Sequence, residues 1–449
     1  MTNFDLIVVG AGTGGAMTAK TATKSGLEVC LVDRKRRPEI GDKICGDAIG
    51  VHHFDNLGLA YPKGDELARE IEGIEVFSPN EKAVFSMKGK GLHGFIINRL
   101  EFGQRILTEA LDAGASLLDE HVATNLILKE GKAAGIISKD LKSSSTEEIY
   151  GKIVVDASGH ASTLRSKAPP DWMIQSTIGN DEVMACYREI REVSTPIESA
   201  QFCKIFLNQT AAPGGYSWIF PKGANTVNVG LGVQMKAGFP NPKKRLYDNV
   251  LSTPFFAGSK ALSGGGGLAP TRRPIDCMVG EGFMLVGDSA CQVNPIHGGG
   301  IGPSMTAGKI AAEVAAKSLE EGDCTTRSLW PYNSSYMKAY GYKQAGLDLF
   351  RIFLQKIGND LIDYGMENVL IKEEDVLKVT SGEELHLNVT EKAERILRGL
   401  GKISLVIRLR ELSILMKEMK NYYSNYPSLD DYADWKMRVE RFYEKAKEI

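Results

Sequence analysis

The sequence predicts a mixed α/β and antiparallel β protein with a helical C-terminal part, and three observations predict it. The first 32 residues contain two short apolar runs on either side of a helix-compatible stretch, which is the pattern of a β–α–β unit. Residues 71–87 and 184–233 are strand-rich and alternate apolar with polar side chains, as strands of an antiparallel sheet do. Beyond residue 330, Lys, Glu, Tyr and Leu dominate, and we expect mostly helices there.

Each element can be placed in turn along the chain. The apolar run at residues 5–9 ends at Gly10 and is expected to be a buried parallel strand. Gly26 ends the helix that we expect at residues 14–25, and a second strand covers residues 27–32. Further along we expect a helix at 100–113, a hairpin between 126 and 149 with an exposed loop at 143–146, a strand at 153–156, a flexible glycine connection at 264–267, a strand at 282–286 and a helix at 300–319.

The β-rich segments interrupt the α/β elements instead of following them. We therefore expect a domain organisation in which one domain is discontinuous in sequence. The predicted domains are an α/β domain at residues 1–70, 97–172 and 268–325, a β-sheet domain at 71–96 and 173–267, and a helical domain at 326–449.

Charge and composition exclude several classes of protein. The 54 Lys and Arg residues nearly balance the 56 Asp and Glu residues, so no overall field attracts nucleic acid. No apolar run reaches the roughly 18 residues that span a bilayer, and the first residues lack the basic region of a signal peptide, so we expect a cytoplasmic protein. The seven cysteines include no Cys-x-x-Cys pair and the seven histidines show no metal-ligand spacing, so no metal site is expected. The 48 glycines indicate places where the backbone approaches another group closely.

Residues 10–15 carry the pattern Gly-x-Gly-x-x-Gly directly after the first strand and at the start of the first helix. Gly10 permits the tight turn, Gly12 lets the backbone reach a pyrophosphate, and Gly15 lets helix and strand pack closely. The helix N-terminus offers N–H groups and a positive dipole to that anion. Asp33 ends the second strand, where a carboxylate can accept hydrogen bonds from both ribose hydroxyls. The pattern predicts a Rossmann-type dinucleotide site.

The same pattern serves NAD and FAD, and three later segments favour FAD. One strand ends with Asp156 and continues to Gly159, and another ends at Asp288. An acid just past a strand can hold the hydroxyls of a ribityl chain. A glycine-rich run then leads into a helix through Gly300 and Ile301, and its dipole would stabilise negative charge on a reduced flavin.

These segments together resemble the FAD-dependent oxidoreductases built like p-hydroxybenzoate hydroxylase, over about the first 325 residues. In that family the matching glycines and Asp33 bind the ADP half of FAD, and Asp288 binds the flavin half. Arg99 looks like the family's arginine near the FAD phosphates, although an arginine there can also cap a helix or lie on the surface. The family usually has Glu where this chain has the shorter Asp33. The resemblance implies FAD contacts from Gly10, Gly12, Thr13, Gly14, Gly15, Asp33, Arg34, Cys45, Gly46, Asp47, Arg99, Val122, Asp156, Gly159, Asp288, Gly300 and Ile301.

An aromatic segment indicates what lies on the flavin. Alternation places Tyr216, Trp218 and Phe220 on one face of a strand, which is also a common feature of a sheet core. The pattern Tyr-x-Trp-x-Phe-Pro, followed by Gly-x-Gly at residues 230–232, closely resembles a motif of the geranylgeranyl reductases. Residues 43–47, Lys-Ile-Cys-Gly-Asp, resemble the cysteine–glycine segment of the same family. In particular, the chain looks like the archaeal members of that family.

This resemblance implies that reduced FAD delivers a hydride to isolated double bonds of geranylgeranyl chains, carried by geranylgeranyl diphosphate or digeranylgeranylglycerophospholipid, in membrane-lipid synthesis. It implies an aromatic wall of Tyr216, Trp218 and Phe220 that binds the prenyl chain together with Pro221 and tolerates cationic character. Cys45 is a candidate near the proton-delivery side, or else a small residue that packs beneath the flavin. An external electron donor, NAD(P)H or a ferredoxin, is then needed.

The sequence leaves two alternatives open. A monooxygenase or halogenase acting on an aromatic substrate is the second function, since halogenases of this fold carry Trp-x-Trp-x-Ile-Pro in a related position. Residues 400–420 mix apolar and basic side chains. They form either a helix at the inner face of the membrane, as a peripheral contact, or a tail helix packed on the body of the protein.

Overall fold

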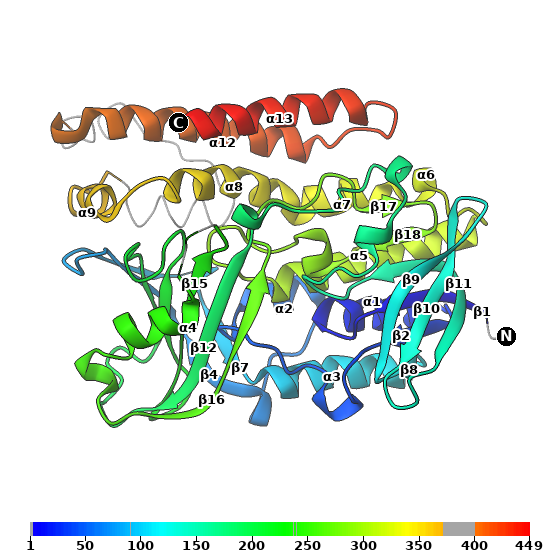
Figure 1. Ribbon diagram of the computed structural model, residues 1–449, viewed down its shortest axis with the longest axis horizontal. Coiled ribbons are helices and arrows are strands. Elements are labelled where there is room, and N and C mark those ends of the chain that lie inside the picture. Colours follow the sequence, from blue (N-terminus) through cyan, green and yellow to red (C-terminus); the bar gives the residue numbers. More distant parts are fainter. Residues whose placement is uncertain (1–2, 90, 237, 239, 371–399) are drawn as a thin grey trace.

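The computed structural model describes residues 3–89, 91–236, 238, 240–370 and 400–449. Two large sheets lie next to each other, and helices of the C-terminal third of the chain run along one side of both (Figure 1). Mixed α/β architecture is therefore confirmed. The domain bounds given above stay a prediction.

The first sheet has eight strands in the order β17-β18-β11-β1-β2-β8, with β10 and β9 extending from β11. β11, β1 and β2 run parallel, and the register places Val9 beside both Val32 and Asp156. The carboxyl ends of three strands thus meet at one edge, where α/β sheets bind ligands. The strands are β1 (Asn3–Val9), β2 (Val29–Val32), β8 (Ser116–Leu118), β9 (His121–Lys129), β10 (Lys132–Asp140), β11 (Thr146–Asp156), β17 (Val279–Gly280) and β18 (Phe283–Leu285).

Three helices belong to this sheet: α1 (Thr13–Lys24), α3 (Arg99–Asp112) and α5 (Ile301–Glu320). α1 crosses α5 at a contact between glycines, because a Cβ atom on Gly308 would lie 2.4 Å from the carbonyl oxygen of Gly14. Because glycine has no side chain, α1 can pack directly on α5 at this crossing.

The second sheet has seven strands in the order β16-β12-β15-β14-β13-β5-β6. Segments 71–87 and 184–233 share it, as expected, but β13 and β5 are parallel rather than antiparallel. A parallel pair needs a long connection, and here more than a hundred residues lie between the two strands, among them β8 to β11 of the first sheet. The strands are β5 (Gly73–Phe77), β6 (Val84–Lys88), β12 (Met184–Glu192), β13 (Phe202–Phe206), β14 (Ser217–Pro221), β15 (Thr226–Gln234) and β16 (Lys260–Ala269).

The prediction of a flexible connection at residues 264–267 is wrong, because these glycines lie inside the edge strand β16. They pair with β12 in register from Gly264 to Gly267. A Cβ atom on Gly265 would lie 2.6 Å from Cδ1 of Ile44. The glycines therefore provide space for a neighbouring segment, not flexibility.

A small three-stranded sheet, which we did not predict, joins the two large ones. Its order is β3-β7-β4, with β3 (Ala48–Gly50), β4 (Leu67–Ile71) and β7 (Gly94–Ile97). Helix α2 (Val51–Leu57) follows β3 directly. Through β3 this sheet fixes residues 43–47 immediately before it.

The C-terminal part is helical wherever it is described: α6 (Thr326–Leu329), α7 (Pro331–Tyr336), a π-helical turn η9 (Met337–Gly341), α8 (Tyr342–Leu354), α9 (Asn359–Glu367), α12 (Ile403–Ser424) and α13 (Tyr432–Glu448). Residues 371–399, for which we also expected helix, lie outside the described residues. α12 packs on α8 and buries Leu412, Leu415 and Met419. Within the described part of the chain, no helix has the length and apolar character needed to cross a bilayer.

Candidate active site

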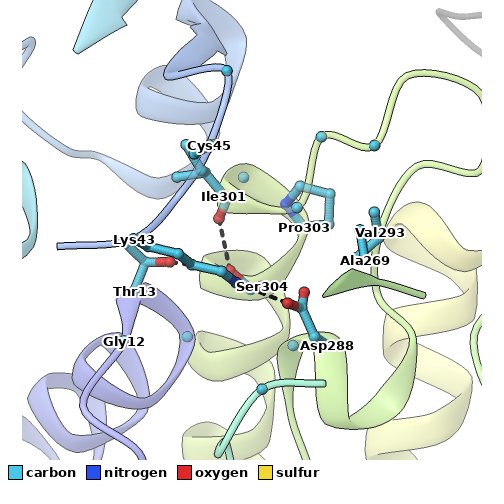
Figure 2. Close-up of a pocket in the computed structure, with 18 of the residues that line it drawn as sticks. Gly12, Thr13, Lys43, Cys45, Ala269, Asp288, Val293, Ile301, Pro303 and Ser304 are labelled. Atoms are coloured by element: carbon cyan, nitrogen blue, oxygen red, sulfur yellow. Dashed lines mark hydrogen bonds and ion pairs between the residues drawn. The ribbon is translucent and has the colours of Figure 1, made fainter. Parts of the chain in front are cut away.

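A cavity of about 1590 Å³ opens between the carboxyl edge of the first sheet and one face of the second. Figure 2 shows part of its lining: Gly12 and Thr13 at the start of α1, Lys43 and Cys45 in the segment before β3, and Asp288 and Ser304 near α5. Strands β12 to β16 supply the opposite wall. Segments far apart in the sequence therefore meet around one space.

The glycine loop after β1 forms one end of the cavity. Gly10 has a φ of +102°, and a Cβ atom there would lie 2.4 Å from the carbonyl oxygen of Ala157. Gly15 does not line the cavity, since it packs against the carbonyl oxygen of Gly10. Gly12 caps α1 without a side-chain hydrogen bond, so the first N–H groups of α1 remain available to an anion.

Asp33 and Arg99 flank this loop. Oδ2 of Asp33 accepts a hydrogen bond from the Ala11 N–H at 2.7 Å, and Oδ1 accepts one from the Lys35 N–H at 2.8 Å. Each carboxylate oxygen keeps a lone pair for a ribose hydroxyl. Arg99 lines the cavity and is only 7% exposed, yet its Nε and Nη1 have no partner among the described residues. An uncapped helix terminus and an uncompensated guanidinium fit the diphosphate of a dinucleotide.

The other end of the cavity is built around the start of α5. Asp288 forms an ion pair with Lys43, at 2.8 Å between Oδ2 and Nζ, which ties the two rims together (Figure 2). Ser304 donates to the carbonyl oxygen of Ile301 at 2.9 Å and lies 3.3 Å from the Thr13 hydroxyl. Gly300 precedes this turn and carries no side chain, so a flat ring can lie against the helix start. The donors and acceptors fit a flavin.

Asp156 does not reach the cavity, and the expectation that it contacts the cofactor is not supported. It is 0% exposed and uses its carboxylate internally. The carboxylate accepts hydrogen bonds from the Ser158 N–H at 3.0 Å, the Arg165 N–H at 3.1 Å and the Ser289 hydroxyl at 3.1 Å. Asp156 instead holds the loops after β11 and β18 in place, while Gly159 does line the cavity.

The wall opposite the start of α5 is the inner face of the second sheet. Trp218 and Phe220 alternate along β14, Tyr216 comes directly before that strand, and all three line the cavity, as the sequence predicts. Cys186 of β12 and Cys203 of β13 lie on the same face. Burial raises the pKa of Cys186 to about 12, so this thiol stays protonated. Pro221 is buried at the end of β14 and does not line the cavity.

Residues 45–47 lie directly against one end of this wall and are fixed by a buried polar network. The Asn228 amide donates to the Cys45 carbonyl oxygen at 2.8 Å and to Oδ2 of Asp47 at 2.9 Å. Its Oδ1 accepts the Trp218 indole N–H at 3.0 Å. Lys222 pairs with Asp47 at 2.8 Å. Gly46 lets Phe220 approach, because a Cβ atom there would lie 3.0 Å from its ring.

Five histidines line the cavity: His52, His53, His121, His160 and His297. The His52 and His53 rings lie 4.1 Å apart between centroids, and His53 packs directly on Gly302 of α5. Burial, followed by the neighbouring His52, lowers the pKa of His53 to about 3. The carbonyl oxygen of His297 accepts the Tyr216 hydroxyl at 2.7 Å, which fixes that ring.

Most of the residues expected from the sequence come together here. Sequence reasoning missed Asn228, Lys222 and His53, and it also missed Arg188, a buried cation on β12. A single asparagine within the otherwise apolar strand β15 was the available signal for Asn228. The predicted residues that line the cavity are Gly10, Gly12, Thr13, Gly14, Asp33, Arg34, Cys45, Gly46, Asp47, Arg99, Val122, Gly159, Asp288, Gly300, Ile301, Tyr216, Trp218 and Phe220.

Comparison with known proteins connects both walls to one family. Residues 182–268 match the model for the geranylgeranyl reductase catalytic domain, and residues 5–170 match that for FAD dependent oxidoreductases. A digeranylgeranylglycerophospholipid reductase of Sulfolobus acidocaldarius is 40% identical over 440 residues, which are 97% of this chain and 96% of that protein. A protein of the same name from Methanoculleus marisnigri is 30% identical over 338 residues, covering 74% of this chain and 82% of its own.

Solved structures share the fold. A geranylgeranyl bacteriochlorophyll reductase-like protein of Thermoplasma acidophilum has a TM-score of 0.77 at 22% identity, covering 92% of this chain and 100% of its own. A flavin-dependent brominase has a TM-score of 0.64 at 19% identity, covering 89% and 98%. Since a 40% identical relative matches nearly end to end and the two family models fall on the two walls of the cavity, the chain belongs to the geranylgeranyl reductase family of FAD-dependent oxidoreductases.

Proposed function

We propose that this protein saturates isolated carbon–carbon double bonds of geranylgeranyl chains, in geranylgeranyl diphosphate or in digeranylgeranylglycerophospholipid, during membrane-lipid synthesis. One observation carries the proposal: Tyr216, Trp218 and Phe220 line the same cavity as Cys45 and the start of α5. The names of the relatives support the same substrate class.

The glycine loop and the start of α5 would hold FAD, which when bound would supply the hydride for the double bond. The chain's own residues have the task of orienting a bond that no carbonyl group activates. The aromatic wall excludes water from the prenyl chain, and its π faces tolerate cationic character at the carbon that accepts the hydride. The fixed Tyr216 ring and the Asn228 contact to Trp218 keep that wall in place.

The carbon that does not accept the hydride must accept a proton. Cys45 carries a thiol in the cavity lining, and its backbone is held by Asn228. We infer that the Cys45 Sγ lies on the side from which the proton arrives, delivered by the thiol itself or by a water beside it.

The proposal includes partners beyond the substrate. Each hydride that leaves the reduced flavin must be replaced, so the proposal includes an external electron donor, NAD(P)H or a ferredoxin. Ile403, Ile407 and Ile414 are each about half exposed along one side of α12. Together with Arg410 and Lys417, this side of the helix supports peripheral contact with a membrane from the cytoplasm.

The test is anaerobic incubation of the dithionite-reduced holoenzyme with geranylgeranyl diphosphate, followed by mass spectrometry of the lipid. We expect a gain of two hydrogens for each reduced double bond and reoxidation of the flavin. Trp218→Ala is expected to retain FAD absorbance and to lose at least about tenfold in rate, since the wall loses its central ring. A paired aerobic incubation with an aromatic substrate tests the second function considered above: oxygen consumption with a hydroxylated or halogenated product, and no gain of hydrogen in the prenyl chain, would establish it instead.

A further inference from the structure

Three buried arginines line the cavity, and two of them have no carboxylate partner among the described residues. Arg351 pairs with Asp348 at 2.7 Å, so its charge is compensated. Arg99 and Arg188 are 7% and 6% exposed and form no ion pair in the described part of the chain. Arg99 lies beside the glycine loop and the open start of α1, where the cofactor diphosphate binds. Arg188 lies on the other wall and needs a separate explanation.

The register of the second sheet places Arg188 among glycines. It pairs with Gly230 of β15 on one side and with Gly265 of β16 on the other. Gly230 in turn pairs with Trp218, so the guanidinium belongs to the same sheet face as the aromatic wall. A Cβ atom on Gly230 would lie 2.7 Å from Cβ of Arg188 and 2.4 Å from the Trp218 ring. The two glycines leave the arginine beside the prenyl-chain wall without flanking side chains.

The polar contacts of Arg188 do not balance its charge. Nη1 lies 3.3 Å from the Ser263 hydroxyl, and Nε is buried with no partner. A neutral hydroxyl at that distance compensates little of the free energy needed to bury a cation. Arg191 on the same strand is the contrast, since it faces the outer side of the sheet and pairs with Glu189. The fold therefore compensates the outward arginine and leaves the inward one open to an anion in the cavity.

A phosphate is the anion that fits. A planar guanidinium binds phosphate oxygens in a bidentate manner and keeps its charge at every physiological pH. The lipid substrates of the proposed reaction carry one, either as a diphosphate or as a phosphodiester. We propose that Arg188 is the phosphate subsite for the head group of the prenyl substrate. This inference rests on the proposed function and adds to it a residue that selects phosphorylated prenyl chains.

Equilibrium binding to the oxidised holoenzyme tests the subsite without any turnover. Calorimetry would compare geranylgeranyl diphosphate, geranylgeraniol and inorganic pyrophosphate as ligands of the wild type, Arg188→Met and Arg188→Lys. We expect Arg188→Met to weaken the binding of geranylgeranyl diphosphate by about 10- to 100-fold and to leave the binding of geranylgeraniol unchanged. The affinity of Arg188→Lys for geranylgeranyl diphosphate should fall between those of the wild type and Arg188→Met, because lysine keeps the positive charge but cannot bind a phosphate in a bidentate manner. Arg191→Met, on the other face of the same strand, is the matched control and should bind like the wild type.

Two results for Arg188→Met would decide against the inference. Equal binding of both prenyl ligands by Arg188→Met would overturn it, and so would loss of FAD absorbance in that variant, since the arginine would then serve the cofactor. If Arg188→Met does not fold, the wild type alone still decides, because inorganic pyrophosphate must compete with geranylgeranyl diphosphate but not with geranylgeraniol. If the wild type binds these ligands as expected but reduces no double bond, the proposed function fails while the anion site stands.

Discussion

Asn228 is the side chain that connects the two walls of the cavity. It is fully buried and uses its amide group on three partners: the Cys45 carbonyl oxygen, the Asp47 carboxylate and the Trp218 indole. Each contact is between 2.8 and 3.0 Å. Asn228 thereby helps to set the separation between the segment that carries Cys45 and the Trp218 ring.

Replacing Asn228 tests this connection. We expect Asn228→Ala to leave the indole N–H and the Cys45 carbonyl without partners, to lower the free energy of unfolding by about 1–3 kcal/mol and to reduce kcat with FAD still bound. Rate and flavin absorbance measured on the same sample separate the effects. Asn225→Ala, in the exposed turn between β14 and β15, is the control. An unchanged kcat in Asn228→Ala would contradict the role assigned to Asn228.

His53 gives the protein a pH dependence of its own. The groups near it are His52, His297 and the Lys343 ammonium, and none of them favours a second positive charge. With a pKa of about 3, His53 stays neutral in the folded protein while the unfolded chain binds a proton near pH 6.5. The unfolded state therefore binds more protons between these values, and stability falls as the pH is lowered from about 6.5 toward 3.

We expect this single group to remove at most about 2 kcal/mol of stability between pH 6.5 and pH 5. His53→Gln should flatten that part of the stability curve, as measured by urea unfolding of the holoenzyme at the two pH values. An identical slope for the wild type and His53→Gln would show that other groups carry the acid dependence.

At the residue level, the aromatic wall could be predicted from the sequence, but the contacts of Asn228 with residues 45–47 could not. Alternation alone places Tyr216, Trp218 and Phe220 on one face, because a strand has a period of two. Asn228 obeys the same alternation, but a polar residue in a strand ordinarily faces water. Its burial depends on Asp47, 181 residues away in the sequence, and no local pattern contains that information.

At the level of elements, the crossing of α1 and α5 leaves no room for a side chain at Gly308. A side chain at Gly308 would meet the Gly14 carbonyl oxygen at 2.4 Å and the Thr18 hydroxyl at 2.8 Å. Because Gly14 belongs to the cofactor loop, moving α1 to make space also moves the loop. The crossing thus links packing of the first sheet's helices to FAD affinity.

Gly308→Val is expected to destabilise the protein by about 1–3 kcal/mol and to lower the FAD retained after gel filtration. The control is Gly365→Ala in α9, where a Cβ atom meets nothing within 4 Å. There we expect unchanged stability or a gain of up to about 1 kcal/mol from helix propensity. Full FAD retention by Gly308→Val would contradict the link between the crossing and the cofactor.

The sequence located most elements, and β16 shows why one was missed. A run of four glycines has a weak strand propensity, so a flexible connection was the natural prediction. The run is a strand because β12 pairs with it and because Ile44 occupies the space above Gly265. Both causes are tertiary contacts. The small sheet of β3, β4 and β7 was missed for a similar reason, since its strands are only three to five residues long.

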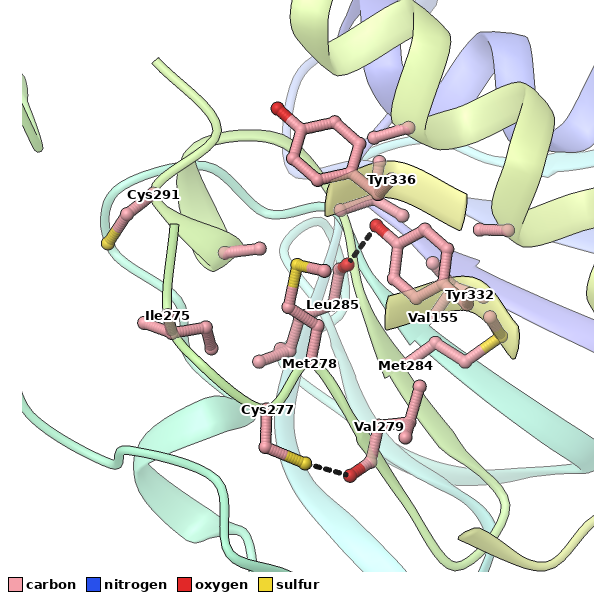
Figure 3. Close-up of a cluster of buried hydrophobic side chains, with 14 of the residues drawn as sticks. Val155, Ile275, Cys277, Met278, Val279, Met284, Leu285, Cys291, Tyr332 and Tyr336 are labelled. Atoms are coloured by element: carbon pink, nitrogen blue, oxygen red, sulfur yellow. Dashed lines mark hydrogen bonds between the residues drawn. The ribbon is translucent and has the colours of Figure 1, made fainter. Parts of the chain in front are cut away.

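At the scale of the whole molecule, buried polar groups attach the C-terminal helices to the first sheet. Tyr332 of α7 donates to the Leu285 carbonyl oxygen at 2.7 Å within a dense apolar cluster (Figure 3). Asp276 accepts the Tyr423 hydroxyl of α12 at 2.6 Å and pairs with Arg273, whose guanidinium lies 3.7 Å above the Tyr443 ring of α13. Burial raises the pKa of Asp276, but Arg273 and the Tyr423 hydroxyl outweigh it and hold that pKa below its ordinary value.

Asp276→Asn should therefore loosen α12 and α13, because Arg273 would remain buried without its partner. We expect a loss of about 3–5 kcal/mol and faster proteolysis within residues 400–449, with FAD still bound. Asp430→Asn removes an exposed ion pair with Arg327 and should change stability by less than about 1 kcal/mol. Equal proteolysis of the two variants would show that apolar packing alone holds the helices.

The glycines on the inner face of the second sheet affect how the enzyme can change its choice of lipid. Gly232 and Gly267 line the cavity on either side of Cys186. An added methyl group on Gly267 would meet its nearest neighbour, Cβ of Ile44, at 3.8 Å, which is ordinary contact. A single-codon change there would shorten the space for the chain without disturbing the backbone or the cofactor loop. Under the proposed function, a substitution on this wall changes which prenyl chain fits, while the glycine loop on the other side of the cavity stays as it is.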